Sequence, residues 1–248
     1  MRLTVLGCSG TYPGPDSPCS GYLVEHDGFR LVIDLGPGAL GPLQRSIDLL
    51  EIDAVYVSHL HADHCTDLVG LSYARRYHPA GLPDPLPVYG PAGLGDRLCR
   101  VFEVPPPDRL REVFDLREVP VGTRQIGPFT VTTLRMEHPV ECHGLRVEAD
   151  GRTLAYSGDT ATTRQLDVLA DGVDVLLCEA SWPDAPDRPE GLHLSGRQAG
   201  EHAARAGAGR LLLTHLMPWT DAGAITAEAA QAYDGPLEVV RCGASYEV

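Results

Sequence analysis

Residues 54–64 read AVYVSHLHADH, a run of apolar and β-branched residues followed at once by three histidines and an aspartate. The apolar run is typical of a strand buried on both faces, and α/β proteins place functional residues in the loop past the carboxyl end of such strands. In an extended loop His59 and His61 turn one way, whereas Asp63 and His64 turn another. Imidazole and carboxylate groups bind zinc-type divalent ions. The stretch therefore predicts a metal site that suits two ions better than one.

Three further candidate ligands follow other apolar runs. His138 comes after TVTTLRM, Asp159 after TLAYSG, and His215 after RLLLT. A single histidine past a strand is ordinarily a surface residue, but equivalent positions at three strand ends indicate convergence on the 59–64 loop. A polar surface run is the alternative interpretation, and the density of the cluster speaks against it.

Short β-type runs alternate with helix-type stretches along the chain, which predicts an α/β fold with strands of mixed direction. We expect strands at residues 3–6, 22–25, 30–34, 54–58, 88–89, 129–134, 145–148, 153–157, 173–178, 210–214 and 237–241. We expect helices after Ser195 and Asp221 and at residues 40–50, 66–77, 107–116 and 163–170. The proline-rich segment 79–107 reads as an irregular excursion, so residues 1–248 are expected to form a single domain.

The composition excludes several kinds of chemistry. The chain has no lysine, so a Walker lysine and a Schiff-base amine are both excluded. With 34 acidic and 20 basic residues the formal net charge is −14, which opposes broad binding to a long nucleic-acid backbone. No apolar run approaches the roughly 20 residues of a membrane helix. Seven scattered cysteines fit free thiols, so we expect a cytoplasmic protein without membrane contact.

The order of these motifs resembles the metallo-β-lactamase superfamily, in its ribonuclease Z-like branch. The resemblance extends from residue 3 to residue 219, through HLHADH, His138, the aspartate of SGDT and the histidine of LLLTH. It implies a four-layer αβ/βα sandwich of two mixed sheets flanked by helices. It also implies a dinuclear centre in which a hydroxide held between two divalent ions attacks a phosphodiester.

The resemblance assigns seven metal ligands. His59, His61 and His138 would bind one ion, Asp63, His64 and His215 the other, and Asp159 would bridge both. Zinc is the first choice of metal, with manganese or iron as alternatives. His138 and His143 compete for one position. In this branch the ligand lies six residues before the glycine of a GYR-like turn, and GLR at 144–146 favours His138. We then expect His143 in a pocket wall or in a polar contact behind the ligands.

Two further residues resemble a proton-donating pair of this branch. Glu179 in CEASW and His193 in LHLSG would protonate the departing oxygen of a phosphodiester, because a histidine kept charged by a carboxylate can donate a proton near neutral pH. Together with Asp63 they are the expected catalytic residues. The alternative is that His193 only precedes a helix cap and Glu179 balances an arginine. Asp34 resembles an aspartate that orients ligand histidines.

Within the ribonuclease Z-like branch, the resemblance also bears on the substrate class. An extended arm that grips tRNA would be inserted after the GYR-like turn, yet only strand and turn residues separate GLR from SGDT. GCSG, GPDSP, RRYHP and the Pro218–Trp219 pair resemble actinobacterial atypical class II cyclic-nucleotide phosphodiesterases. The resemblance implies hydrolysis of 3′,5′-cyclic AMP, or cyclic GMP, by a homodimer. Alternatives are tRNA 3′-processing or cleavage of another small phosphodiester, and a non-catalytic metal-binding regulatory protein.

Overall fold

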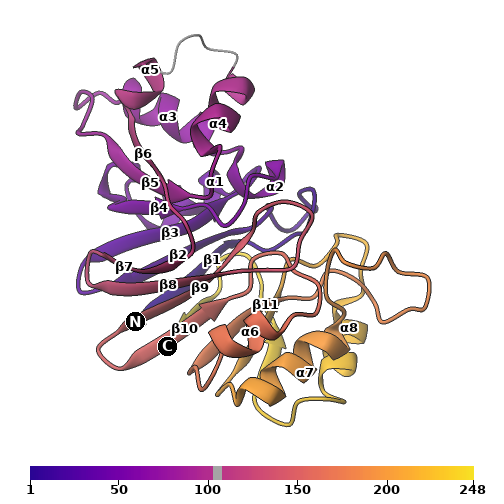
Figure 1. The fold of residues 1–248 in the computed structure, drawn as a ribbon. Coiled ribbons are helices and arrows are strands. Elements are labelled where there is room, and N and C mark those ends of the chain that lie inside the picture. The colour runs from indigo at the N-terminus through magenta and orange to yellow at the C-terminus, as the bar shows by residue number, and fades with distance from the viewer. Residues whose placement is uncertain (103–107) are drawn as a thin grey trace.

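The computed structural model describes residues 1–102 and 108–248, and these form two mixed β-sheets with helices on both outer sides (Figure 1). This arrangement confirms the predicted αβ/βα sandwich. No helix of the described residues combines the length and apolar character needed to cross a bilayer.

The first sheet has the strand order β14-β1-β2-β3-β4-β5-β6. Neighbours are antiparallel from β14 to β3 and parallel from β3 to β6. Its strands are β1 (Arg2–Gly7), β2 (Gly21–His26), β3 (Phe29–Leu35), β4 (Ala54–Tyr56), β5 (Leu86–Gly90), β6 (Phe114–Glu118) and β14 (Ser245–Glu247). Figure 1 shows strands β1 to β6 of this sheet in indigo to magenta, beneath the helices at the top of the view.

The second sheet has the order β13-β12-β11-β10-β9-β8-β7. It is antiparallel from β7 to β10 and parallel from β10 to β13. Its strands are β7 (Gly122–Ile126), β8 (Phe129–Arg135), β9 (His143–Ala149), β10 (Arg152–Tyr156), β11 (Val175–Glu179), β12 (Leu211–Thr214) and β13 (Leu237–Val239).

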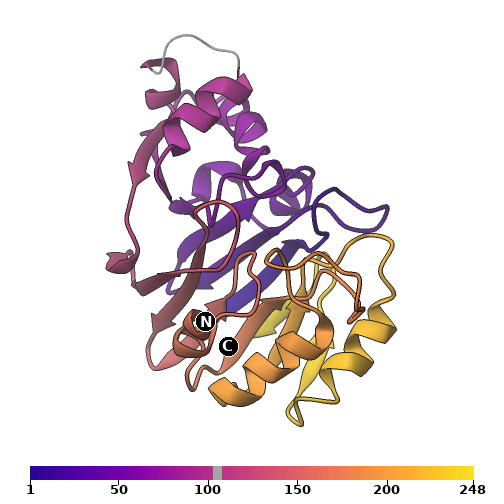
Figure 2. The ribbon, with the colours of Figure 1, turned by 45° about the vertical axis from the view of Figure 1, so that its right-hand side comes forward.

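The helices divide between the two outer faces, as Figure 2 shows from a second side. The helices over the first sheet are α1 (Leu40–Ser46), α3 (Leu68–Arg76), α4 (Leu94–Phe102) and α5 (Asp108–Arg111), with the short turns η1 (Leu49–Glu51) and α2 (Ala62–Cys65). The second sheet carries α6 (Arg164–Leu169), α7 (Gly196–Ala206) and α8 (Ala222–Ala229). The helix predicted after Ser195 is α7, and a capping box of Ser195 and Gln198 begins it, because each side chain accepts a backbone N–H of the other residue.

Apolar side chains fill three layers, one between the sheets and one under each set of helices. Aromatic contacts tie the two sheets together. The Tyr22 and Tyr156 ring centroids lie 5.1 Å apart, and the Tyr22 hydroxyl lies 2.7 Å from Thr214 Oγ1. These buried contacts hold the loops after β4, β8, β10, β11 and β12 in a fixed relation to one another.

Two expectations about local structure are corrected. The predicted helix at residues 107–116 is wrong beyond Arg111, because the chain turns and β6 begins at Phe114. Phe114 is fully buried and pairs in register with Leu86 of β5, so burial in the sheet overrides the helical pattern. The predicted irregular excursion contains the regular helix α4, and its residues 103–107 lie outside the described part of the chain.

Candidate metal centre

The predicted ligands come together in two overlapping groups. One contains His59, His61, His138 and Asp159, and the other contains Asp63, His64, His215 and Asp159. Within each group the candidate ligand atoms all lie within 4.8 Å of one another. Asp159 belongs to both, which is the arrangement a bridging carboxylate requires.

The first group presents three imidazole nitrogens to one point. His61 Nδ1 lies 3.1 Å from His59 Nε2 and 3.2 Å from His138 Nε2. Nitrogens bound to one tetrahedral zinc at about 2.0–2.1 Å would be roughly 3.3 Å apart. The donor set and its spacing therefore fit a zinc-type ion.

The second group is built around buried atoms without hydrogen-bond partners. His64 Nε2 and His215 Nε2 each lie 3.3 Å from an oxygen of Asp159, and neither nitrogen has a hydrogen-bond partner. Asp159 Oδ1 is buried and lacks a partner as well. Leaving buried polar atoms unpaired costs about 1–3 kcal/mol each, which a bound cation would offset. These atoms fit a second ion beside the first.

Hydrogen bonds from the opposite ring nitrogen orient several of these histidines. His64 Nδ1 lies 2.8 Å from Asp34 Oδ2, and His138 Nδ1 lies 3.1 Å from the Leu192 carbonyl oxygen. His215 Nδ1 lies 2.8 Å from Ser20 Oγ. When Nδ1 carries the proton, Nε2 keeps a free lone pair, which is the form that binds a metal. Ser20, next to the start of β2, thus orients His215.

Asp34 connects the candidate ligands to both sheets. Its carboxylate accepts hydrogen bonds from the backbone N–H and hydroxyl of Ser58, at 2.7 and 2.8 Å, and from the Tyr156 hydroxyl at 2.8 Å. Tyr156 belongs to the second sheet, so this contact crosses the sandwich. Asp34 and His215 both have positive φ, a conformation that costs a non-glycine residue about 1–2 kcal/mol. Their hydrogen bonds offset this strain.

The electrostatics of the centre are dominated by burial and by mutual charge. Burial alone would raise the pKa of Asp159, but His215, His64 and His59 hold it well below its usual range. Burial would lower the pKa of His64, but Asp159 and Asp34 raise it well above the ordinary value. His59, in contrast, has a pKa lowered by burial and by the neighbouring His64. Asp159 is therefore ionised, and its negative charge favours positive charge, from a proton or a metal ion, within the second group.

Glu179 and His193 lie beside the two groups. His193 Nδ1 is 3.1 Å from Glu179 Oε1 and 3.9 Å from Asp159 Oδ2. Burial would lower the pKa of His193, but Glu179 outweighs it and raises the pKa to about 9. Glu179 also accepts from the Thr160 N–H at 2.6 Å and the Ser181 hydroxyl at 2.7 Å. The pair therefore places a protonated imidazole at the edge of the centre.

Several contacts of the centre were not predicted from the sequence. The Thr11 N–H donates to Asp63 Oδ2 at 2.9 Å, and the Trp182 ring is stacked on His193 with centroids 6.0 Å apart. At Gly36, a Cβ atom would collide with the Asp63 carbonyl oxygen, so only glycine lets the 59–64 loop approach β3 this closely. The GCSG and LGPG runs were the available signals, since glycine-rich turns mark close backbone approach.

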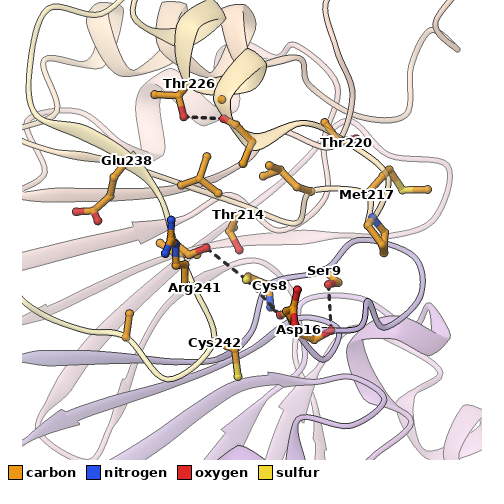
Figure 3. Close-up of a pocket in the computed structure, with 18 of the residues that line it drawn as sticks. Cys8, Ser9, Asp16, Thr214, Met217, Thr220, Thr226, Glu238, Arg241 and Cys242 are labelled. Carbon is orange, nitrogen blue, oxygen red and sulfur yellow. Dashed lines mark hydrogen bonds between the residues drawn. The ribbon is translucent and has the colours of Figure 1, made fainter.

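A surface cavity of about 1020 Å³ lies behind the second group (Figure 3). Thr214 and Leu216, the neighbours of His215, contribute to its wall, and Ser9 and Asp16 line it from the other side. None of the seven candidate ligands lines this cavity. It is therefore separate from the space between the two groups.

The comparisons with known proteins agree with this geometry. Residues 29–216 match the β-lactamase superfamily domain. The chain belongs to the β-lactamase superfamily. The uncharacterized protein Rv1339 of Mycobacterium tuberculosis (strain ATCC 25618 / H37Rv) is 46% identical over 259 residues, covering all of this chain and 92% of that protein. The predicted superfamily is thereby confirmed.

Two other members of the superfamily define the branch. The crystal structure of the metallo-β-lactamase fold protein YhfI from Bacillus subtilis has a TM-score of 0.90 at 27% identity, covering all of this chain and 99% of its own. A ribonuclease Z of Mycobacterium bovis (strain BCG / Pasteur 1173P2) is 28% identical over 272 residues, covering 96% of this chain and 95% of that protein. These matches confirm the ribonuclease Z-like branch, and the chain is a metallo-hydrolase of this superfamily.

The shared position of Asp159 gives a testable result. Zinc added to metal-stripped protein at about 100 times its Kd should raise the free energy of unfolding by roughly 2.7 kcal/mol. At the same zinc concentration, zinc should raise the free energy of unfolding of Asp159→Asn clearly less, because the substitution removes negative charge from both groups. Urea titration with and without zinc measures this gain. Asp167→Asn, which alters a carboxylate paired with His202 and Arg205 on α7, is the matched control and should keep the full gain. An equal gain in Asp159→Asn would contradict the shared role.

Proposed function

We propose that the protein is a dinuclear-metal phosphodiesterase that hydrolyses 3′,5′-cyclic nucleotides, cyclic AMP first and cyclic GMP second, to nucleoside monophosphates. The observation that carries this proposal is the pair of ligand groups sharing Asp159, with His193 beside them. When bound, two divalent ions, zinc before manganese or iron, would supply Lewis acidity and an activated water to the phosphorus.

The residues of the chain would divide the work between binding and proton transfer. His59, His61 and His138 would hold one ion, and Asp63, His64 and His215 the other, with Asp159 between them. Cleaving the P–O3′ bond leaves an alkoxide that must gain a proton. His193, kept charged by Glu179 at 3.1 Å, would donate that proton to the departing 3′ oxygen. The Trp182 ring and Glu179 together would fix the orientation of the imidazole.

The small-substrate assignment is supported by the chain between β9 and β10. These strands are joined by Asp150 and Gly151 alone, both with positive φ, as in a tight hairpin turn. The resemblance places a tRNA-gripping arm in this stretch of ribonuclease Z-like chains, and this chain has only the two-residue turn there. The net charge of −14 also opposes extended RNA outside the centre. A homodimer remains part of the proposal and rests on the sequence resemblance. A cytoplasmic location is also part of it and rests on the seven scattered cysteines and the lack of a long apolar run.

A second candidate function is tRNA 3′-processing. It is favoured by the 28% identity to a ribonuclease Z over nearly the whole of both chains. The two functions need the same centre and differ in substrate size, so one purified sample decides between them.

Metal-loaded protein should release AMP from 3′,5′-cyclic AMP, and the Asp63→Ala/His64→Ala double variant should lose this activity, because it removes two ligands of one group. Chromatography of the nucleotides measures the reaction, and His202→Ala, which alters a buried histidine of α7, is the control. Two bound metals with no hydrolysis of any cyclic nucleotide would refute the proposal. Cleavage of precursor tRNA by that same sample would favour the second function.

His193 gives a prediction about the leaving group. His193→Ala should slow hydrolysis of cyclic AMP by about a hundredfold to ten-thousandfold, the usual contribution of general acid catalysis. It should slow hydrolysis of bis-p-nitrophenyl phosphate much less, because p-nitrophenolate departs without a proton. Paired kcat measurements on the two substrates test this. Equal losses on both would mean that His193 acts in some way other than as the acid.

A further inference from the structure

His143 is a fully buried histidine that belongs to neither ligand group. It is the first residue of β9, in the second sheet. Its own backbone N–H donates to the Ser58 carbonyl oxygen at 2.9 Å, next to the 59–64 loop. A buried imidazole must find partners for both ring nitrogens, and the partners it finds connect two parts of the centre.

Both ring nitrogens of His143 are paired. Nδ1 lies 2.9 Å from the Tyr56 hydroxyl oxygen, and Nε2 lies 3.0 Å from Glu141 Oε1. Burial lowers the pKa of His143 although Glu141 opposes the shift, and burial raises the pKa of Tyr56 to about 12. The imidazole is therefore neutral and the phenol keeps its proton. The Tyr56 hydroxyl donates to Nδ1, and the N–H at Nε2 donates to the Glu141 carboxylate.

The two partners of His143 lie on the two segments that supply the three histidines of the first ligand group. Tyr56 ends β4, three residues before His59. Glu141 lies three residues after His138, in the loop between β8 and β9. β4 belongs to the first sheet and β8 and β9 to the second, so the three histidines of this group come from opposite sheets. The His143 side chain thus joins the two segments whose relative position determines the geometry of the first ligand group.

The first group tolerates little movement of either segment. Its ligand nitrogens are 3.1 and 3.2 Å apart, and binding to one ion requires that all of them stay near these distances. We propose that His143 is a positioning residue that fastens the His138 loop to the end of β4, so that His138 meets His59 and His61 at one metal position. This inference rests on the metal centre of the proposed function.

The test measures zinc affinity, not activity, by competition with a chelator. Two single-group proteins separate the sites: His215→Ala, in which the second group is incomplete, and His138→Ala, in which the first is incomplete. His143→Phe, which keeps a ring but loses both hydrogen bonds, should weaken zinc binding about tenfold in the His215→Ala protein, at the lower end of the effect of residues that orient ligands. It should leave affinity unchanged in the His138→Ala protein.

Glu141 provides a second variant that does not disturb the core, because its side chain is 37% exposed. Glu141→Ala in the His215→Ala protein should weaken zinc binding in the same direction as His143→Phe. Glu141→Gln should retain most of the affinity, since its amide oxygen can still accept the N–H of His143. This pair keeps the test decisive if His143→Phe fails to fold.

His202→Phe is the matched control for loss of a buried histidine. His202 is fully buried on α7 and bonded to Asp167, and it lies in neither ligand group. If His143 had a merely structural role, His143→Phe and His202→Phe would both lower the stability of the protein, and both would leave its zinc affinity unchanged. Zinc affinities of His143→Phe and Glu141→Ala within twofold of that of the His215→Ala protein would overturn the positioning role. Absence of zinc binding in the protein without substitutions would instead refute the proposed centre itself.

Discussion

The rest of the structure depends on one buried carboxylate, that of Asp159, surrounded by imidazole rings. Burying a negative charge is costly unless positive charge or a metal compensates it. His59 and His64 approach Asp159 from the 59–64 loop, and His215 approaches it from the distant segment after β12. The strands that end at these segments must therefore be held rigidly, and the aromatic contacts between the sheets do this. Stability of the sandwich and chemistry of the centre share the same side chains.

Asp34 shows how the two requirements meet in a single residue. Its carboxylate fixes His64, fastens the backbone that precedes His59, and receives the Tyr156 hydroxyl from the opposite sheet. The positive φ of Asp34 is a local cost that these three contacts repay. His143 makes a comparable connection on the other side of the centre, between Tyr56 and Glu141. The two sets of contacts meet at Ser58, whose N–H and hydroxyl donate to Asp34 and whose carbonyl oxygen accepts the N–H of His143.

Much of the fold and the clustering of the candidate ligands could be predicted from the sequence, because ligands directly after apolar strands leave a strong local signal. The supporting contacts could not. The Leu192 carbonyl behind His138 and the Thr11 N–H on Asp63 are backbone groups, which every residue carries. The contact of Tyr156 with Asp34 joins residues 122 positions apart and depends on how the sheets stack. The sequence did not predict β6, because Phe114 is in a strand through its pairing with the distant strand β5, and its neighbours in the chain carry no signal of that pairing.

The proposed chemistry requires that two ions share Asp159. Crystals grown with zinc and measured on both sides of the zinc absorption edge would test it most directly. Two anomalous peaks are expected, one among His59, His61 and His138 and one among Asp63, His64 and His215, each next to Asp159. A single peak, or peaks away from these side chains, would contradict it.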